Sequence, residues 1–292
     1  GVAFYESRVL PVSPLVAERG DALKACLAAC KKYGVQCHVW KVCWNMGTAT
    51  DEAFVKQMAA EGRTQKMFNG KAQERWLCPS DPRNQSQEVA AMVELATQFP
   101  VDGIHFDYIR YPEEDACFCD GCRKRFEERL GRKLAKWPQD TRDGGETEKA
   151  WNEFRRGNIS TVVQRVAEAV HGKSGVKISA AVFRNPESDP DTIAQDWPTW
   201  CRKGWLDFAC PMDYVDSVAM FRNMATNQAK AVGRAKLYPG IGLSCWKNPR
   251  DPVLLARQIE AVRELGFSGF TVFNFDGCAE AVLPDLHLGV TR

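Results

Sequence analysis

Short apolar runs alternate with amphipathic stretches along nearly the whole chain. Seven apolar runs of strand length predict β-strands, near residues 2–6, 35–44, 101–107, 176–183, 205–212, 236–242 and 269–275. Between these runs, apolar residues recur every three or four positions, which predicts amphipathic helices. Seven of the predicted helices lie near residues 21–34, 51–61, 82–98, 148–171, 197–203, 217–232 and 251–265. An eighth predicted helix has Phe126, Leu130 and Leu134 on its apolar face. The predicted strands have no polar face, which is typical of a parallel sheet covered by helices.

Polar residues follow most of the predicted strands, and this spread favours a TIM-type (β/α)8 barrel. A doubly wound open sheet is the alternative, but such a sheet concentrates its site at one switch point. Seven strands are counted, so the barrel lacks one, and the natural place for it is before Gly1. We expect a single domain over residues 1–292, with a cysteine-containing loop and helix inserted at about 113–147.

Composition excludes several classes of function. The chain has 292 residues, with 39 Lys and Arg against 37 Asp and Glu, so its net charge of +2 indicates neither nucleic acid nor an anionic membrane surface as a partner. No apolar run approaches the roughly 20 residues of a membrane span. The chain also lacks the Gly-x-Ser-x-Gly, Gly-x-Gly-x-x-Gly and phosphate-loop motifs. We therefore predict no cofactor for catalysis, and the oligomeric state stays open.

The segment 101–112 carries the densest candidate chemistry, and reads Val-Asp-Gly-Ile-His-Phe-Asp-Tyr-Ile-Arg-Tyr-Pro. Strand alternation places His105 and Asp107 on one face, with Asp107 at the end of the strand. A carboxylate in a core strand is costly unless it is hydrogen-bonded or used. Residues at the carboxyl end of barrel strands are catalytic candidates, although a structural ion pair of Asp107 with Arg110 is the alternative.

The stretch 102–112 closely resembles the fourth-strand motif of the bacterial glycosyl-hydrolase-like family ten. Four weaker similarities follow the family's order along the chain: Tyr-Glu-Ser-Arg-Val-Leu-Pro at 5–11, His-Val-Trp at 38–40 with Asn45, Trp-Leu-Cys-Pro-Ser-Asp-Pro at 76–82, and Pro-Met-Asp-Tyr at 211–214. On this alignment the family's first strand and helix are missing.

The resemblance implies a TIM barrel that hydrolyses glycosidic bonds, often in exported bacterial proteins, with peptidoglycan glycan strands among the associated substrates. The family is distantly similar to barrel glycosidases with an Asp nucleophile on strand four and an Asp acid/base on strand six. By that analogy, the catalytic pair is Asp107 and Asp213. The carbohydrate is then the expected partner, and a non-catalytic carbohydrate-binding barrel is the alternative.

Glycoside hydrolysis uses two carboxyl groups across the scissile bond, one ionised and one protonated. Asp107 is expected to be the ionised one, because Arg110 would lower its pKa if it folds back. Asp213 lies among apolar residues, which would raise its pKa and suit a general acid. Alternatively, Asp213 caps the helix after Ser217.

Candidate substrate-binding residues lie at or near strand ends and offer hydrogen-bonding or sugar-stacking groups. They are Glu6, His38, Trp40, Asn45, His105, Arg110, Tyr111, Tyr214, Trp246, Asn274 and Asp276. Structural roles compete with several of these assignments. Glu6 could pair with Arg8, Asp276 could belong to a turn before Gly277, and either histidine could be a satisfied core residue.

Three of the twelve cysteines are unusual, because Cys117, Cys119 and Cys122 fall within six residues. This spacing resembles three-quarters of a structural zinc site, whose fourth ligand would come from elsewhere, such as Cys78 or a histidine. Three free thiols, or one disulfide and one thiol, are the alternative. In either case the cluster follows strand four and would shape the rim of the cleft.

Overall fold

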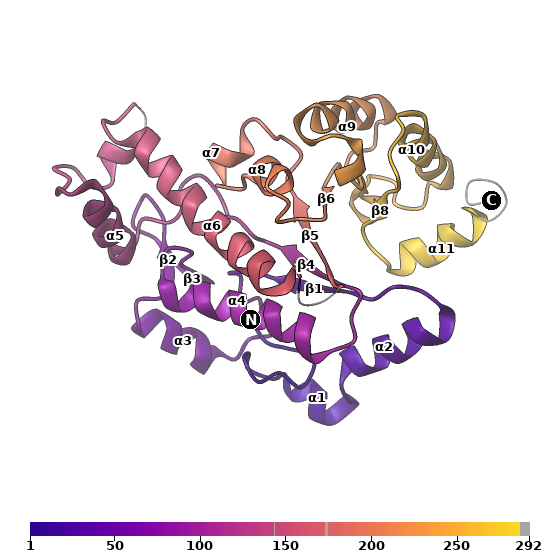
Figure 1. The fold of residues 1–292 in the computed structure, drawn as a ribbon, viewed down its shortest axis with the longest axis horizontal. Helices are drawn as coiled ribbons and strands as arrows, with labels where there is room; N and C mark the ends of the chain where they lie inside the picture. Colours follow the sequence, from indigo (N-terminus) through magenta and orange to yellow (C-terminus); the bar gives the residue numbers. More distant parts are fainter. Residues whose placement is uncertain (143, 173–174, 287–292) are drawn as a thin grey trace. The chain divides into compact units, whose positions relative to one another are not determined.

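A computed structural model describes residues 1–142, 144–172 and 175–286 of the chain (Figure 1). These residues divide into two compact units. Unit 1 comprises Gly1–Ile178 and Pro190–Asp196, and unit 2 comprises Ser179–Asp189 with the chain from Trp197 onward. The expectation of a single domain stays a prediction.

The central strands of unit 1 are β1 (His38–Val42) and β4 (Gly103–Asp107), which pair in parallel. Their register sets His38 level with Gly103 and Val42 level with Asp107. The pattern along β4 follows the predicted alternation, since Ile104 and Phe106 are fully buried. Asp107 therefore lies at the carboxyl end of an interior strand, as predicted.

An antiparallel hairpin occupies part of the segment that the sequence predicts to be irregular. It consists of β2 (Thr64–Lys66) and β3 (Ala72–Leu77), joined by a turn at Asn69 and Gly70. Gly70 has a φ of 85°, a conformation that Asn-Gly turns favour. The polar composition of these strands concealed them, although the Asn-Gly pair was a hairpin signal.

Four helices in the first part of the chain begin and end close to the predicted limits: α2 (Ala22–Tyr33), α3 (Glu52–Ala60), α4 (Pro82–Gln98) and α6 (Glu148–Val170). The predicted helix with Phe126 and Leu130 is α5 (Asp120–Leu130), which ends before Leu134. The short helices α1 (Pro14–Arg19), η1 (Gln139–Thr141) and α7 (Asp189–Thr192) were not predicted. The side chains of Asp21, Asp51 and Asp81 accept hydrogen bonds from first-turn N–H groups and fix the starts of α2, α3 and α4.

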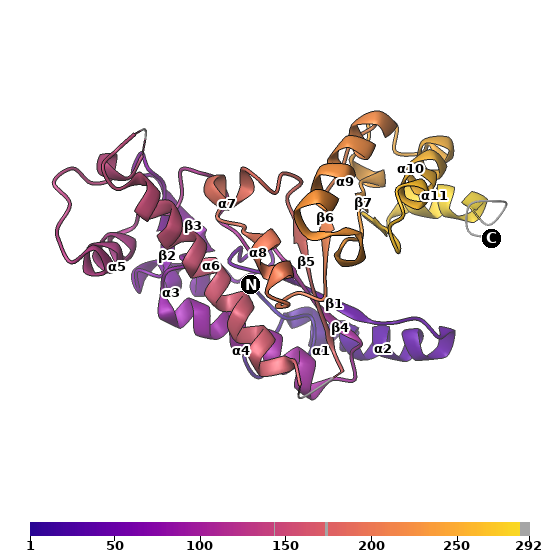
Figure 2. The same cartoon turned by 45° about the horizontal axis from the view of Figure 1, so that its top comes forward.

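Helices α4 and α6 run side by side in both views (Figures 1 and 2). The predicted apolar stripe of α6 is fully buried, from Ile159 through Val162, Val163, Val166 and Val170. The N-terminal part of α6 also anchors the inserted segment. The indole ring of Trp151 packs against Phe118, Phe126 and Trp137, with ring centroids 4.9–5.3 Å apart.

Unit 2 contains two short parallel strand pairs. Residues of β5 (Lys177–Val182) pair with β6 (Phe208–Pro211), and β7 (Gly240–Ile241) pairs with β8 (Thr271–Val272). The helices are α8 (Trp197–Arg202), α9 (Val218–Val232), η2 (Arg234–Lys236), η3 (Leu243–Cys245), α10 (Pro252–Glu264) and α11 (Gly277–Leu286). Most strands are shorter than predicted, and the run at 2–6 forms only a parallel bridge between Ala3 and Val12.

The packing of β1 against β4 requires glycine at position 103. A Cβ at this position would lie 2.1 Å from Nδ1 of His38, well inside van der Waals contact. We expect Gly103→Ala to lower the free energy of unfolding by about 1–3 kcal/mol, as overpacking does, measured by urea denaturation. Gly175→Ala is the matched control, because a Cβ there meets nothing within 4 Å.

Replacement of His38 by Ala in the Gly103→Ala background should recover most of the lost stability, since it removes the clashing ring. Equal stability of the two glycine variants would contradict this account of the close approach.

Candidate active site

Asp107 is held in place by two hydrogen bonds at the end of β4. The indole Nε1 of Trp40 donates to Asp107 Oδ2 over 2.9 Å, and the backbone N–H of Tyr108 donates to Oδ1 over 2.7 Å. Trp40 reaches the carboxylate because the neighbouring strand β1 runs parallel to β4. The two strands thus fix the orientation of the candidate catalytic carboxyl group.

Burial dominates the pKa of Asp107 and raises it above the ordinary value. The two hydrogen bonds and the positive charge of Arg110 act in the opposite direction but are weaker. Arg110 thus lowers the pKa of Asp107, as predicted, but burial outweighs this effect and the net shift is upward. Arg110 lies with its guanidinium 5.0 Å from the ring centroid of Tyr108, and its Nη1 donates to the carbonyl oxygens of Tyr111 and Pro112.

Two residues beside Asp107 adopt left-handed backbone conformations. Trp44, which follows the end of β1, has a φ of 61°, and Tyr108, which follows β4, has a φ of 53°. Each such residue other than glycine costs on the order of 1–3 kcal/mol, and such residues cluster at functional sites. The backbone N–H of Cys43 donates to the carbonyl oxygen of Asp107 over 2.8 Å, which ties the two strand ends together.

A cavity of about 590 Å³ runs along β1, and Trp40, Asn45 and His38 are among its lining residues. Its volume lies within the range of small-molecule sites, roughly 300–1,000 Å³. Neither Asp107 nor any other residue of β4 lines it, so the cavity reaches the candidate carboxyl group only through Trp40. The side chain of Trp40 is 57% exposed, so one ring face is available while the indole nitrogen holds Asp107. The amide oxygen of Asn45 accepts from the N–H of Gly47 over 2.7 Å, which gives it a structural role in the turn.

The two predicted histidines lie along the β1–β4 pair. His38 stands level with Gly103 at the start of β1, four residues from the level of Asp107, or about 13 Å at the usual rise of a strand. Burial lowers the pKa of His105 to about 4, with a contribution from the charge of His38. His105 is therefore a neutral imidazole at physiological pH.

In unit 2, Asp213 lies two residues beyond β6 and is fully buried. Its Oδ1 accepts from Gln228 Nε2 over 2.6 Å, and its Oδ2 has no hydrogen-bond partner among the described residues. Burial raises its pKa to about 8, against the smaller effects of Gln228 and Arg184. The apolar setting acts as predicted, and the alternative of a helix cap fails because Ser217 caps α9.

Two predicted aromatic contacts are wrong, because both rings are buried. Tyr111 is fully buried, its hydroxyl accepts from Asn158, and the guanidinium of Arg155 lies 4.7 Å from its ring centroid. Trp246 is likewise a core residue. Neither side chain offers an exposed face to a sugar, because both are buried, which position along the sequence could not reveal.

The remaining candidates in unit 2 have local partners. Tyr214 stacks on Phe273, with the ring centroids 5.3 Å apart and the planes 15° from parallel. Asp276 accepts from Ser244 Oγ over 2.7 Å and from the N–H groups of Cys278 and Ala279. These bonds lower its pKa, and they make it a capping residue of α11 rather than a free substrate acceptor.

The last two candidates are Glu6 in unit 1 and Asn274 in unit 2, which shares Ser244 with Asp276. Glu6 is exposed, and no ion pair with Arg8 is found among the described residues. The backbone N–H of Asn274 donates to Ser244 Oγ over 3.1 Å, while its side chain is half-buried. Both remain predictions.

A buried ion pair joins Lys41 of β1 to Glu88 of α4, and it was not predicted from the sequence. Both side chains are almost inaccessible to solvent, and Glu88 Oε1 also accepts from the N–H of Trp44 over 3.3 Å. This pair supports the strained turn after β1. A lysine inside an apolar strand run and a glutamate on the apolar stripe of a helix were the available signals.

The predicted cysteine cluster forms in the structure and gains a fourth member. The sulfur atoms of Cys78, Cys117, Cys119 and Cys122 all lie within 4.8 Å of one another, and all four side chains are buried. The sequence had suggested either Cys78 or a histidine as the fourth ligand. All twelve cysteines of the chain are free thiols.

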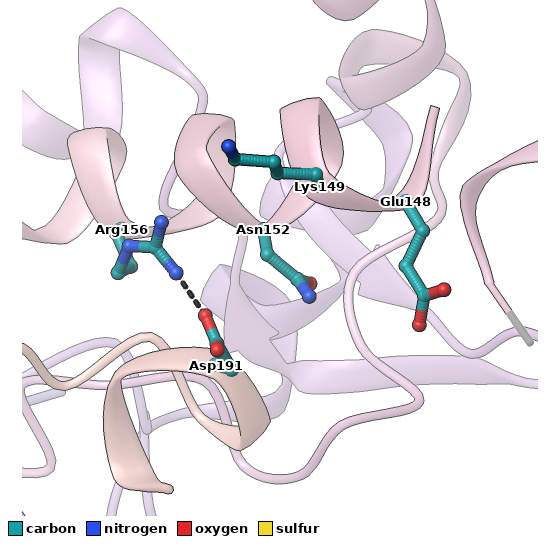
Figure 3. Close-up of a pocket in the computed structure, with 5 residues that line it drawn as sticks. All are labelled: Glu148, Lys149, Asn152, Arg156 and Asp191. Atoms are coloured by element: carbon teal, nitrogen blue, oxygen red, sulfur yellow. Dashed lines mark hydrogen bonds and ion pairs between the residues drawn. The ribbon is translucent and has the colours of Figure 1, made fainter. Parts of the chain in front are cut away.

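A second cavity, of about 310 Å³, lies at the start of α6 and is lined by Glu148, Lys149, Asn152, Arg156 and Asp191 (Figure 3). Arg156 and Asp191 form an ion pair across it. Its lining is charged and contains no aromatic ring, so it lacks the stacking surface that a sugar site uses.

Solved structures define the class of fold. The glycoside hydrolase domain of PgaB (BpsB) from Bordetella bronchiseptica aligns with a TM-score of 0.74 and 15% identity, covering 98% of this chain and 82% of that chain. The catalytic domain of β-amylase from Paenibacillus polymyxa aligns with a TM-score of 0.59 and 13% identity, covering 86% and 79%. The chain has the α/β fold of TIM-barrel glycoside hydrolases, which confirms the predicted fold class.

The sequence model of the family Glycosyl hydrolase-like 10 matches residues 1–243, and the chain belongs to this family. Glycosyl hydrolase DigH of Escherichia coli (strain K12) is 25% identical over 276 residues, covering 82% of this chain and 59% of that protein. The chain thus spans about three-fifths of the length of this relative. Among the described residues, no helix has the length and apolar character to span a membrane.

The buried carboxyl group of Asp213 predicts how stability depends on pH. Its pKa is about 8 in the folded chain and about 3.9 in an unfolded one. Between these values the folded state binds more protons, so the free energy of unfolding falls as pH rises, by up to about 1.4 kcal/mol per pH unit.

We expect Asp213→Asn to remove this dependence, so that the variant gains stability relative to the parent between pH 5 and pH 8 in urea denaturation. Asp216→Asn, at an exposed position in the same loop, serves as the control. A constant difference between the parent and Asp213→Asn across this range would contradict the burial of a protonated Asp213.

Proposed function

We propose that the protein hydrolyses glycosidic bonds in a polysaccharide or glycan, with Asp107 as nucleophile or stabilising base and Asp213 as acid. The observation that carries the proposal is the placement of Asp107 at the carboxyl end of β4, hydrogen-bonded to an exposed tryptophan. Catalytic residues of (β/α) barrels come from this end of the strands. An aromatic ring beside a carboxylate suits a sugar, whose apolar face stacks on it.

The chemistry assigns opposite protonation states to the two carboxyl groups. Asp213, with a pKa of about 8, is protonated at neutral pH, which is the state that a general acid requires. Asp107 would meet the developing positive charge at the sugar carbon in its ionised form. The hydrogen bonds from Trp40 and Tyr108 favour that form against the effect of burial.

The substrate class follows from the family resemblance, and peptidoglycan glycan strands are the first candidates to test. Trp40 is the proposed stacking platform, with Tyr214, Asn274 and Glu6 as further substrate contacts. We also expect the protein to be exported, as the resemblance implies.

A carbohydrate-binding barrel without turnover is the second candidate, and the burial of Asp213 favours it. A general acid must reach the glycosidic oxygen, and Asp213 is fully buried in this structure. Under this alternative Trp40 would still bind sugar, while Asp107 would accept hydrogen bonds from its hydroxyl groups.

The central test is hydrolysis of a panel of polysaccharides, including peptidoglycan glycans, by the parent and by Asp107→Asn. We expect the asparagine variant to lose activity by roughly 10²–10⁴-fold, because its side chain carries no negative charge. Release of reducing ends measures the rate. Glu18→Gln, at an exposed position on α1, is the matched carboxyl-to-amide control and should keep full activity.

Near-parental turnover by Asp107→Asn would remove this residue from the mechanism. Binding of a glycan by the parent, without turnover of any member of the panel, would instead establish the binding barrel. The anomeric configuration of the first product separates a nucleophilic Asp107, which retains configuration, from a basic one, which inverts it.

The hydrogen bond from Trp40 predicts a change in the pH profile. Trp40→Phe keeps an aromatic ring but removes the indole N–H that favours the ionised form of Asp107. The pKa of Asp107 should therefore rise, and the acidic limb of kcat/KM should move to higher pH. Trp205→Phe, at a half-buried position of unit 2 before β6, is the control for the loss of an indole group. If the acidic limb of kcat/KM is the same in Trp40→Phe and in the parent, the hydrogen bond from Trp40 does not set the pKa of the group whose ionisation limits activity.

A further inference from the structure

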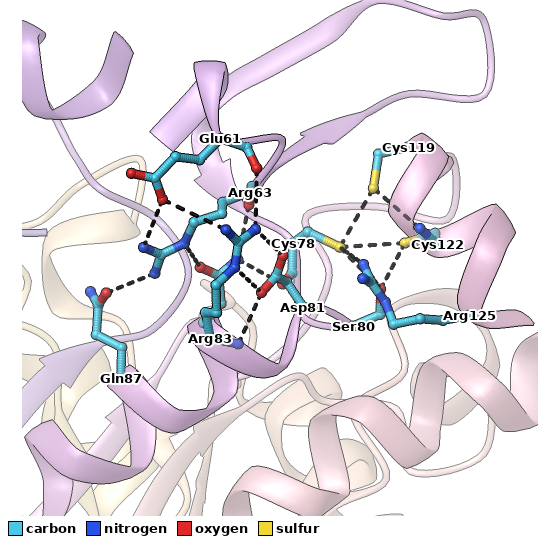
Figure 4. Close-up of polar contacts among 11 residues, drawn as sticks. Glu61, Arg63, Cys78, Ser80, Asp81, Arg83, Gln87, Cys119, Cys122 and Arg125 are labelled. Carbon is cyan, nitrogen blue, oxygen red and sulfur yellow. Dashed lines mark hydrogen bonds and ion pairs between the residues drawn. The ribbon is translucent and has the colours of Figure 1, made fainter. Parts of the chain in front are cut away.

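Four buried cysteines converge from two segments that lie about forty residues apart in the sequence. Cys78 follows β3, whereas Cys117, Cys119 and Cys122 lie just before α5 and in its first turn. Figure 4 shows the sulfur atoms of Cys78, Cys119 and Cys122 directed toward one another. All four sulfur atoms lie within 4.8 Å of one another, so they surround a common point.

The spacing of the sulfur atoms fits a tetrahedral metal ion. Cys78 Sγ lies 3.4 Å from Cys122 Sγ and 3.7 Å from Cys119 Sγ. Zinc–sulfur bonds of about 2.3 Å in a tetrahedron place neighbouring sulfur atoms about 3.8 Å apart. A disulfide would use only two of the four and leave two thiols buried beside it. The convergence of all four on one point therefore favours an ion over oxidation.

The surroundings suit a site with excess negative charge. Four thiolates around a zinc ion leave a net charge of −2, which needs compensation when buried. The guanidinium of Arg125 donates to Ser80 Oγ over 2.9 and 3.1 Å, and its Nη2 lies 3.9 Å from Cys78 Sγ (Figure 4). It is the neighbouring cation that such a centre requires.

The backbone adds further support to the thiolates. Cys119 is the N-cap of α5, and its sulfur accepts the N–H of Cys122 over 3.4 Å. The start of this 11-residue helix carries partial positive charge, which favours a thiolate there. Ser80 Oγ lies 3.2 Å from Cys78 Sγ and 3.1 Å from Cys122 Sγ, within reach for a further hydrogen bond.

We propose that Cys78, Cys117, Cys119 and Cys122 bind one structural zinc ion. Four protein ligands fill the tetrahedron and leave no position for water or substrate, so the ion has no catalytic role. The inference stands independently of the proposed glycan hydrolysis.

The ion would fix the segment that follows β4. The N–H of Phe118 donates to the carbonyl oxygen of Lys66 over 2.7 Å, and the N–H of Phe68 to that of Asp115 over 2.8 Å. The segment thus lies along the β2–β3 hairpin, and Cys78, just beyond the hairpin, would attach it through the metal. The same segment begins at Tyr108, whose N–H holds the carboxylate of Asp107. Zinc would therefore stabilise the loop that borders the candidate active site.

The test is the metal content of the chain purified under reducing conditions without added chelator. We expect about one zinc per chain, as a closed four-cysteine site holds, and a loss of that zinc in Cys78→Ser and Cys122→Ser. Cys201→Ser, which removes another buried thiol in α8, is the matched control and should retain the ion. Circular dichroism of each variant identifies any that fail to fold.

A second measurement on the parent chain needs no variant. After the ion is exchanged for Co²⁺, the visible absorption spectrum should show the bands of a tetrahedral Co²⁺ site. The ultraviolet spectrum should show charge transfer from thiolate to metal. Metal-free protein that takes up neither Zn²⁺ nor Co²⁺ after reduction would overturn the proposal, as would a disulfide found among the four cysteines by mass spectrometry. Loss of the zinc from Cys201→Ser as readily as from Cys78→Ser would place the ion elsewhere and overturn the assignment.

Discussion

The parallel pairing of β1 with β4 is the interaction on which the candidate site depends. Its register sets Val42 beside Asp107, and from this neighbouring strand the indole of Trp40 reaches the carboxylate. At the other end of the pair, the absence of a side chain at Gly103 leaves room for the ring of His38. A shift of one residue would turn Trp40 to the other face and leave Asp107 without this donor. The orientation of the Asp107 carboxyl group therefore depends on the pairing of β1 with β4 more than on the loop that follows β4.

Burial governs the electrostatics of both proposed catalytic acids. Asp107 has a raised pKa although two hydrogen bonds and the charge of Arg110 act to lower it. Burial raises the pKa of Asp213 to about 8, against the smaller, lowering effects of the Gln228 hydrogen bond and the charge of Arg184. Loss of hydration destabilises a charged carboxylate more than these partners stabilise it. Such carboxyl groups reduce the stability of the fold at neutral pH, and a reaction that needs a protonated acid gives a reason for Asp213 to be there.

The inserted segment shows how a long excursion after a strand is held without regular sheet structure. Its hydrogen bonds join it to the β2–β3 hairpin, the ring of Trp151 packs against Phe118, and four cysteines gather where the hairpin ends. These attachments come from parts of the chain distant in sequence, and they converge on one region of unit 1. The polar composition of the segment alone would suggest an unattached loop.

The sequence by itself determined most of the order of helices and parallel strands, because local signals suffice for them. It did not predict the β2–β3 hairpin or the short helices α1 and α7, and the run at 2–6 forms no regular strand. Asp81 and Pro82 start α4, the 3.6-residue period marks α6, and alternation along β4 places Asp107 correctly. Tertiary structure decided which of the candidate groups are accessible. Tyr111 and Trp246 are core residues, Asp276 caps a helix, and only Trp40 combines an exposed ring with a bond to Asp107. Tertiary structure also selected Cys78 as the fourth cysteine. The physical reason is that burial and convergence depend on contacts between distant segments, which no local pattern of residues encodes.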